Sequence, residues 1–268
     1  MKVFPKIGIK DILCVSLSGD NLKFAYERVS PTHRELVDLV SYTIQGLSDE
    51  EITKSVQSTL NSLKLSSPEV IVMVPSHATI AKNIEIPSLD VEEIKEIIDL
   101  QAGRHTPYAR EEIIVDYINI GAYRENYTKI LLIIVTLSVV RRQIDILEKA
   151  GLKVEKVYFS SEMIAQFCSQ RLKLGQKNNV RTLIHIDANF TDFIQMIKGE
   201  IVFVRSIPIG RQHFINEPER YHLRFIEEVK KSFETYQSED IGPLPEEIIL
   251  TGSEKEDGEL QKLLSEGV

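Results

Sequence analysis

A repeated strand–turn–strand pattern is the feature of this sequence that most constrains its fold. Residues 13–20 (LCVSLSGD) and residues 184–191 (IHIDANFT) share one layout, in which an apolar strand runs into a short polar turn that leads to a second strand. Each pattern opens a half of the chain in which strands and helices alternate. This order is typical of the α/β class.

The first half continues with a helix and a buried strand. Ser48 and Glu51 have the spacing of a capping box, which predicts a helix from there to residue 63. The apolar run at residues 70–74 predicts a strand that ends at Pro75.

A separate module is expected between Pro75 and Gly151. Its strands are predicted at residues 80–86, 113–120 and 129–135. Two helices begin at Asp90 and Ser138, which are good N-cap residues, and Gly151 closes the second of them. The order predicts an inserted α+β subdomain whose three strands share one sheet.

The main fold resumes after this insertion. Further strands are predicted at residues 154–159, 182–187, 193–197, 201–207 and 247–250, and helices from Ser160 and at residues 225–236. Residues 175–179 are a polar linker and a domain boundary. The predicted parts are a first subdomain (1–75 and 152–181), the insertion (76–151) and a second subdomain (182–268), which is shortened or truncated.

Composition excludes several classes of protein. The chain has 32 Lys and Arg against 40 Asp and Glu, a net charge of −8, whereas a nucleic-acid binder needs a basic surface. The longest apolar run, residues 130–140, is shorter than the roughly 20 residues that span a membrane, and the N-terminus lacks the apolar core of a signal peptide. Cys14 and Cys168 form no metal-binding or disulfide pattern, so the reducing cytoplasm is the expected location.

The two hairpins, with a strand–Thr–Gly–helix unit near Gly252, resemble the actin/sugar-kinase/Hsp70 superfamily, which has a ribonuclease H-like fold. In that fold two hairpins face each other and grip the phosphates of a nucleotide, and a third loop holds the adenosine. The resemblance implies a two-lobed α/β molecule.

The insertion carries a more specific resemblance. The motifs I-E-I-P (84–87), P-Y (107–108), E-E-I-I-V-D-Y (111–117), L-E-K-A-G-L (147–152) and S-I-P-I-G (206–210) follow in this order. They resemble the type IV pilus assembly protein PilM family, actin-like relatives of the cell-division protein FtsA. The resemblance implies a cytoplasmic scaffold, peripheral to the inner membrane of a pilus or type II secretion-like complex. It also implies a partner, the cytoplasmic N-terminal tail of a PilN-like bitopic membrane protein.

The resemblance places a nucleotide cleft at Gly19, Lys23, Asp187, Asn189, Thr191 and Gly252. The first loop departs from the family's D-I-G-S-S-S-V-K, because Ser16 stands where an acid orients the magnesium waters and Ser18 stands where glycine is usual. In the second loop Asn189 replaces glycine but tolerates positive φ, and Phe190 replaces a small residue and is expected to fill the phosphate space.

The third loop keeps only Gly252, and residues 246–268 carry seven acidic and two basic side chains, which repel a triphosphate. We therefore expect a degenerate nucleotide site that binds ATP and magnesium weakly or not at all. No catalytic and no metal-ligating residue is assigned, and the protein is expected not to be an enzyme.

Two other functions remain open at this point. One is an ATP-binding switch of the same machinery, with Lys23, Asp187 and Thr191 on the phosphates, and the other is an FtsA-like cell-division protein. For the scaffold, the groove between the insertion and the first subdomain is expected to take the partner's extended peptide. Self-association stays open, no nucleic acid is expected, and the membrane is reached only through partners. His185 is interpreted as an ordinary strand residue and His105 as a surface residue.

Overall fold

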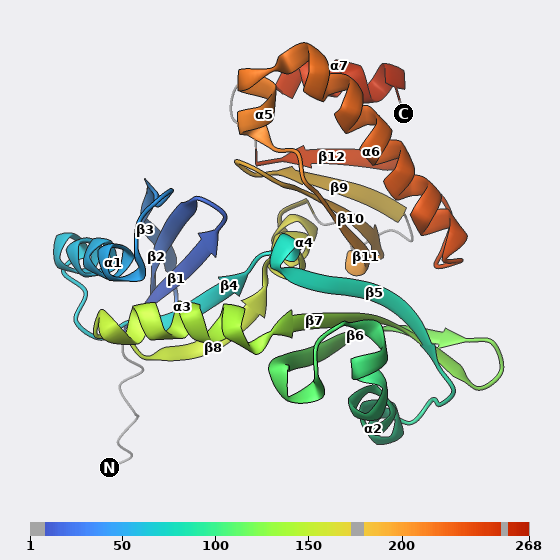
Figure 1. Ribbon diagram of the computed structural model, residues 1–268, viewed down its shortest axis with the longest axis horizontal. Coiled ribbons are helices and arrows are strands. Elements are labelled where there is room, and N and C mark those ends of the chain that lie inside the picture. Colours follow the sequence, from blue (N-terminus) through green and yellow to red (C-terminus); the bar gives the residue numbers. More distant parts are fainter. Residues whose placement is uncertain (1–8, 173–179, 253–256, 268) are drawn as a thin grey trace. The chain divides into compact units, whose positions relative to one another are not determined.

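The first structural unit is built on a five-stranded sheet. The computed structural model describes residues 9–172, 180–252 and 257–267, and in it this unit comprises Met1–Pro75 and Ser138–Phe159. The sheet has the order β3-β2-β1-β4-β8, in which β1, β2 and β3 are antiparallel and β4 and β8 are parallel to β1 (Figure 1). Its strands are β1 (Lys10–Ser18), β2 (Asn21–Val29), β3 (Arg34–Thr43), β4 (Glu69–Val74) and β8 (Val154–Phe159).

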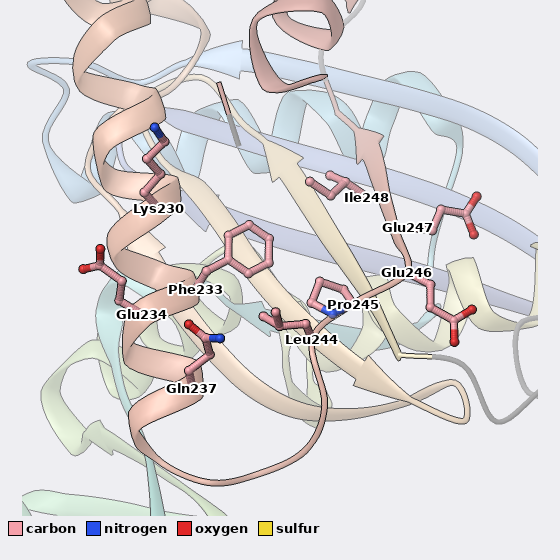
Figure 2. A pocket seen from close by; sticks show the side chains of 9 residues that line it. All are labelled: Lys230, Phe233, Glu234, Gln237, Leu244, Pro245, Glu246, Glu247 and Ile248. Carbon is pink, nitrogen blue, oxygen red and sulfur yellow. The ribbon is translucent and has the colours of Figure 1, made fainter. Parts of the chain in front are cut away.

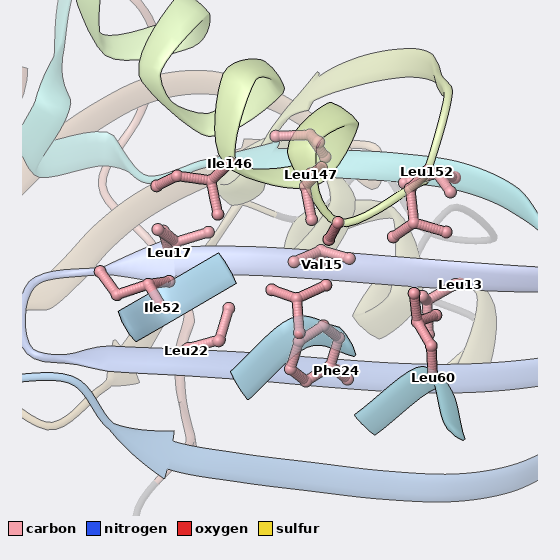
Figure 3. Close-up of a cluster of buried hydrophobic side chains, with 14 of the residues drawn as sticks. Leu13, Val15, Leu17, Leu22, Phe24, Ile52, Leu60, Ile146, Leu147 and Leu152 are labelled. Carbon is pink, nitrogen blue, oxygen red and sulfur yellow. The ribbon is translucent and has the colours of Figure 1, made fainter. Parts of the chain in front are cut away.

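Helices α1 (Asp49–Leu63) and α3 (Leu137–Lys149) pack on this sheet. The predicted capping box of α1 is confirmed, since the Ser48 N–H donates to the Glu51 carboxylate at 2.8 Å and the Glu51 N–H donates to Ser48 Oγ at 3.3 Å. The core shown in Figure 3 joins side chains of the sheet with those of both helices, among them Leu13, Val15, Phe24, Ile52, Leu60, Ile146 and Leu147.

Two details of α3 differ from the sequence analysis. The helix begins at Leu137, so Ser138 lies inside it and is not its N-cap. Its apolar stripe, with Ile146 and Leu147, packs in the core of the first unit although the sequence analysis grouped this helix with the insertion. Gly151 takes a left-handed φ of 91° after the helix, as its predicted C′ role requires. The subdomain boundaries themselves stay a prediction.

The second unit comprises Ser76–Leu137 and Ser160–Val268 and contains two sheets. The larger has the order β11-β10-β9-β12. Its strands are β9 (Val180–Ile186), β10 (Thr191–Ile197), β11 (Glu200–Ile207) and β12 (Glu247–Thr251). The helices that follow the insertion are α4 (Ser160–Leu172), α5 (Arg211–Asn216), α6 (Pro218–Ser238) and α7 (Asp257–Gly267). Phe225, Val229 and Tyr236 of α6, which lie within the helix predicted at residues 225–236, are buried against this sheet.

The smaller sheet of this unit has the order β5-β7-β6. Its strands are β5 (Thr79–Ile86), β6 (Ile113–Tyr123) and β7 (Tyr127–Thr136), and helix α2 (Val91–Gln101) packs on it. Ile84, Val115 and Ile133 lie on these three strands, which confirms that they share one sheet. Asp90 caps α2 by accepting from the Glu92 and Glu93 N–H groups at 3.0 Å. Short 3₁₀ turns occupy Ser76–Ala78, Ala102–His105 and Arg110–Glu112.

Lys129 connects the smaller sheet to helix α6. Its ammonium group, on β7, donates to the carbonyl oxygens of Glu239 at 2.6 Å and Asp240 at 2.8 Å, directly after the helix. The same nitrogen lies 4.1 Å from the centre of the Tyr123 ring. A cation at these carbonyl groups satisfies acceptors that a helix leaves unpaired at its C-terminal end.

The two larger sheets repeat one topology. In each, a three-stranded antiparallel meander is followed by helix, α1 in the first and α5 and α6 in the second, and then by a strand parallel to the first strand, β4 or β12. This confirms the repeated hairpin read from the sequence. In the first sheet β8 continues the series beyond β4, whereas β12 is the end strand of the second sheet within the described ranges. The predicted linker at residues 175–179 lies outside these ranges.

Candidate functional site

The first predicted phosphate loop is the turn between β1 and β2. Gly19 in this turn has φ of 55°, a left-handed conformation that glycine adopts without strain. Lys23 lies on β2 directly opposite Ser16 on β1, so the retained lysine and the substituted acid position are cross-strand neighbours. These residues all belong to the first unit.

The second predicted loop, residues 187–190, joins β9 to β10 in the second unit. The Asp187 N–H donates to the carbonyl oxygen of Phe190 at 2.9 Å, and the Ala188 N–H donates to the Asp187 carboxylate at 2.8 Å. Asn189 is not among the described residues with positive φ, so the turn closes without the left-handed conformation that asparagine tolerates. Two amide groups that could face an anion are thus used within the turn.

Thr191 is the first residue of β10 and is fully buried. Its hydroxyl group donates to the carbonyl oxygen of Ile209 at 2.7 Å. This hydrogen bond joins the start of β10 to the segment just before α5. In this conformation it is not available to a ligand.

Two glycines lie close to the backbone at the C-terminal end of β9. A Cβ atom on Gly210 would lie 2.5 Å from the carbonyl oxygen of Asp187 and 2.6 Å from the Phe190 nitrogen. A Cβ on Gly252, which has φ of 93°, would lie 2.4 Å from the carbonyl oxygen of Ile186. The second loop, the segment before α5 and the residue after β12 therefore come together at this end of β9. Asp187 and Gly252, which were predicted to share a site, both lie there. Residues 253–256, the part of the third loop that follows Gly252, lie outside the described residues.

Phe190 stacks on His77, a contact that the sequence analysis missed. The two ring centres are 3.9 Å apart and the planes differ by 8°, so the rings lie face to face. Burial lowers the pKa of the His77 imidazole below its ordinary value of 6.5, and the Asp192 and Asp187 carboxylates oppose that shift. A neutral imidazole thus covers one face of the phenyl ring beside the turn.

Asp192 forms a buried polar cluster next to this stack. Its carboxylate accepts hydrogen bonds from the hydroxyl groups of Ser76, in the 3₁₀ turn before β5, and of Ser161 in α4. One sequence signal could have revealed it, an acid among the apolar residues of a buried strand, TDFIQMI. The neighbouring His185 has a structural contact, since its Nδ1 lies 2.9 Å from Thr251 Oγ1 on β12, in line with an ordinary strand role.

The polar groups of Asp192 and Thr191 are hydrogen-bonded to other parts of the protein. Within the described ranges no group of three or more His, Cys, Asp or Glu side chains could hold a metal ion. Gly19 and Lys23 belong to one unit and Asp187, Asn189, Thr191 and Gly252 to the other, so the six-residue nucleotide cleft as a whole stays a prediction.

The fold places the chain among actin-like proteins. It matches a Bacteroides thetaiotaomicron protein of actin-like ATPase fold with a TM-score of 0.57 and 16% identity, over 100% of this chain and 91% of the other. A chain of a PilM–PilN type IV pilus biogenesis complex matches with a TM-score of 0.77 and 17% identity, over 95% of this chain and 86% of the other. The cytoplasmic domain of EpsL, an inner-membrane component of the Vibrio cholerae type II secretion system, matches with a TM-score of 0.53 and 11% identity, over 96% and 94%. At these identities the matches show the fold alone.

The sequence identifies the family. The chain belongs to the type IV pilus assembly protein PilM family, whose sequence model matches residues 6–241. No curated protein sequence matches the chain. The resemblance found in the order of the insertion motifs is therefore confirmed, as is the actin-like fold that it implied.

Among the helices that the structure describes, none combines the length and the apolar composition needed to cross a bilayer. The predicted groove for a partner peptide was placed between the insertion and the first subdomain. The three-stranded sheet of the insertion and the five-stranded sheet of the first subdomain lie in different units, so the groove stays a prediction.

Proposed function

We propose that this chain is a non-enzymatic scaffold of a type IV pilus or type II secretion-like assembly complex. In this role it binds the cytoplasmic N-terminal tail of a PilN-like bitopic membrane protein. It works in the cytoplasm and reaches the inner membrane through that partner. The single observation that carries the proposal is the family match over residues 6–241.

Two likenesses support the partner and the location. One solved structure of the same fold is a PilM–PilN complex, and its matched chain aligns with 95% of this one. Another is the cytoplasmic domain of an inner-membrane secretion component. An extended tail can bind a folded partner by pairing with the edge of a sheet, with small pockets for alternate side chains.

The contacts of the second loop support a scaffold that works without nucleotide. The Thr191 hydroxyl group donates to Ile209, the Ala188 amide donates to Asp187, and Phe190 is stacked on His77. A phosphate at this turn would have to replace these contacts, and Ser16 supplies no carboxylate to hold magnesium waters. These contacts and the missing carboxylate at position 16 argue against a magnesium nucleotide at this turn.

Isothermal titration calorimetry with the N-terminal tail of the PilN-like protein from the same genome tests the proposal. We expect one site per chain and no heat from a scrambled tail of equal composition. The same tail, immobilised, should capture the full 268-residue chain from solution. A well-behaved tail that gives neither heat nor capture would overturn the scaffold role.

A further inference from the structure

Strand β3 is an edge of the five-stranded sheet that exposes many apolar side chains. It pairs with β2 on one side, and among the described residues no strand pairs with its other side. Leu36 is 59% exposed, Val37 40%, Leu39 66% and Tyr42 37%. The segments that join β3 to β2 and to α1 are both among the described residues, so this open side is a property of the fold. An exposed apolar edge of this kind can pair with another strand.

The backbone of β3 presents hydrogen-bonding groups on this open side. The Leu39 N–H donates to the side-chain carboxylate of Asp38 at 2.8 Å, which places it on the side away from β2. Because the N–H groups of a strand alternate between its two sides, those of Ser41 and Thr43 face the same way. The ladder with β2 is regular over residues 38–43 and is interrupted just before them. This regular half is therefore the part of the edge that can extend the sheet.

The charge pattern of β3 is self-complementary. Arg34, Glu35 and Asp38 are its charged residues, and residues 39–43 (LVSYT) carry no charge. Two copies that pair antiparallel about a two-fold axis near residue 40 set this charge-free half against itself. The acids of each strand then lie opposite uncharged residues of the other. A parallel pairing in register would instead set each acid opposite the same acid, which is unfavourable.

The other edge strands suit a second copy less well. Among the described residues, β8 and β6 each expose one large apolar side chain, Val157 and Ile114, and β5, β11 and β12 expose none. Strand β12 begins beside Glu246 and Glu247, whose carboxylates point away from α6 in Figure 2. A chain with a net charge of −8 repels its copy at such acids, but not at residues 39–43.

We propose that the β3 edges of two copies pair antiparallel over residues 39–43 and join this chain into a two-fold symmetric dimer. Two copies of the five-stranded sheet then continue across the axis as one sheet. The pairing covers Leu39 and Tyr42, which the single chain leaves exposed. This dimer goes beyond the proposed binding of a PilN-like tail and does not depend on it.

Asp38 opposes the pairing, because its carboxylate occupies the Leu39 N–H that a second strand would use. Association should therefore be weak and depend on protein concentration. Sedimentation velocity of the full chain should show the dimer fraction rising between about 10 μM and about 1 mM. Asp38→Ala should strengthen association about threefold, because it frees this N–H. Glu35→Ala, which removes an equal charge but no such hydrogen bond, should have little effect.

Matched variants locate the interface. Leu39→Lys sets two like charges near the axis and should weaken association at least about tenfold, whereas Leu223→Lys on α6 should leave it unchanged. Leu39 is 66% exposed and Leu223 is 71% exposed, so the fold tolerates both changes. Ser41→Pro removes an outward N–H, which an edge strand tolerates, and should abolish the dimer.

Hydrogen exchange gives a second measurement on the unmodified chain. The amides of Leu39, Ser41 and Thr43 should exchange more slowly at about 1 mM than at about 10 μM protein. A chain that stays monomeric at the higher concentration, or a dimer that Leu39→Lys leaves intact, would overturn the proposal. Slower exchange at β3 caused by the PilN-like tail would also overturn it, because the edge would then belong to that partner.

Discussion

The hydroxyl group of Ser161 donates a 2.6 Å hydrogen bond to the carboxylate of Asp192. The second oxygen of that carboxylate accepts from Ser76. Ser76 directly follows Pro75, and Ser161 is the second residue after Phe159, so both serines stand where the chain has just entered the second unit. Asp192 on β10 therefore binds the two segments by which the chain enters the second unit to the larger sheet of that unit.

Removal of this acid should destabilise the protein. Asp192 is 8% exposed, and Asp192→Ala leaves two buried hydroxyl groups without their acceptor. We expect a loss of about 2–4 kcal/mol in the free energy of unfolding, because each unpaired buried group costs about 1–3 kcal/mol. Urea denaturation followed by circular dichroism measures this.

The control for this prediction is Asp145→Ala on the exposed side of α3. It should change stability by no more than about 0.5 kcal/mol, as exposed substitutions usually do. Ser161→Ala should fall between the two variants, since it removes one donor and leaves Ser76 in place. Equal stability of the Asp192 and Asp145 variants would show that the cluster contributes nothing.

The His77–Phe190 stack predicts a dependence of stability on pH. Burial lowers the pKa of His77 in the folded protein below 6.5, so the unfolded chain binds the proton more tightly. The stabilising effect of the neutral ring is therefore complete above pH 6.5 and is lost as the pH falls below that value toward the lower folded pKa. His77→Phe keeps an aromatic ring against Phe190. In this variant the melting temperature should decrease less than in the unmodified protein as the pH falls from about 6.5 to about 5.

His33→Gln, on the exposed β2–β3 turn, is the control for this titration. Its melting curve should keep the pH dependence of the unmodified chain. Burial also lowers the pKa of His105, so part of the slope should survive in the His77 variant. A His77→Phe profile parallel to that of the unmodified protein would contradict the assignment.

Much of the fold could be predicted because its local signals agree with the tertiary structure. The capping box at Ser48 specifies α1, the alternating residues at the start of β6 specify that strand, and the amphipathic stripe of α6 specifies that helix. Strand β3 gave no such signal. All its residues but Val40 are exposed, so charged and apolar side chains mix without alternation. It forms because β2 offers an edge, which is a tertiary condition.

The contacts of the candidate site were less predictable for the same reason. The sequence indicated which residues form the second loop but not that Thr191 would be fully buried. The stack of Phe190 on His77 joins positions 113 residues apart, and no local pattern encodes such a pair. That Phe190 fills the phosphate space stays a prediction, and the structure adds that its ring stacks on His77.

Gly210 predicts a steric limit behind the second loop. Gly210→Ala would place a Cβ atom within 2.7 Å of three backbone atoms of residues 187–190, and backbone cannot move aside as a flexible side chain can. We expect a loss of about 1–3 kcal/mol, the usual cost of overpacking. Gly103→Ala, which meets no atom within 4 Å, should leave stability nearly unchanged in the same chemical denaturation.

Magnesium ATP directly tests the hypothesis that the nucleotide site is degenerate. At 1 mM it should stabilise the chain by well under 1 kcal/mol, because a dissociation constant near 1 mM or weaker gives little linkage. The physical reason is the set of contacts around the second loop, where the Thr191 hydroxyl and the Ala188 amide are already used within the protein. Thermal shift and equilibrium dialysis measure the effect, and no phosphate release is expected.

The competing hypothesis, an ATP-binding switch, makes the opposite prediction. A site with a dissociation constant near 10 μM would stabilise the chain by about 2.7 kcal/mol when free nucleotide is at about 100 times that constant, near 1 mM. That corresponds to a rise in melting temperature of several degrees for a chain of this size. Asp187→Ala should abolish such a shift if the acid holds the nucleotide, whereas under the scaffold hypothesis it leaves the negligible response unchanged. Saturable binding in this range, lost in the Asp187 variant, would therefore establish the switch and refute the degenerate site.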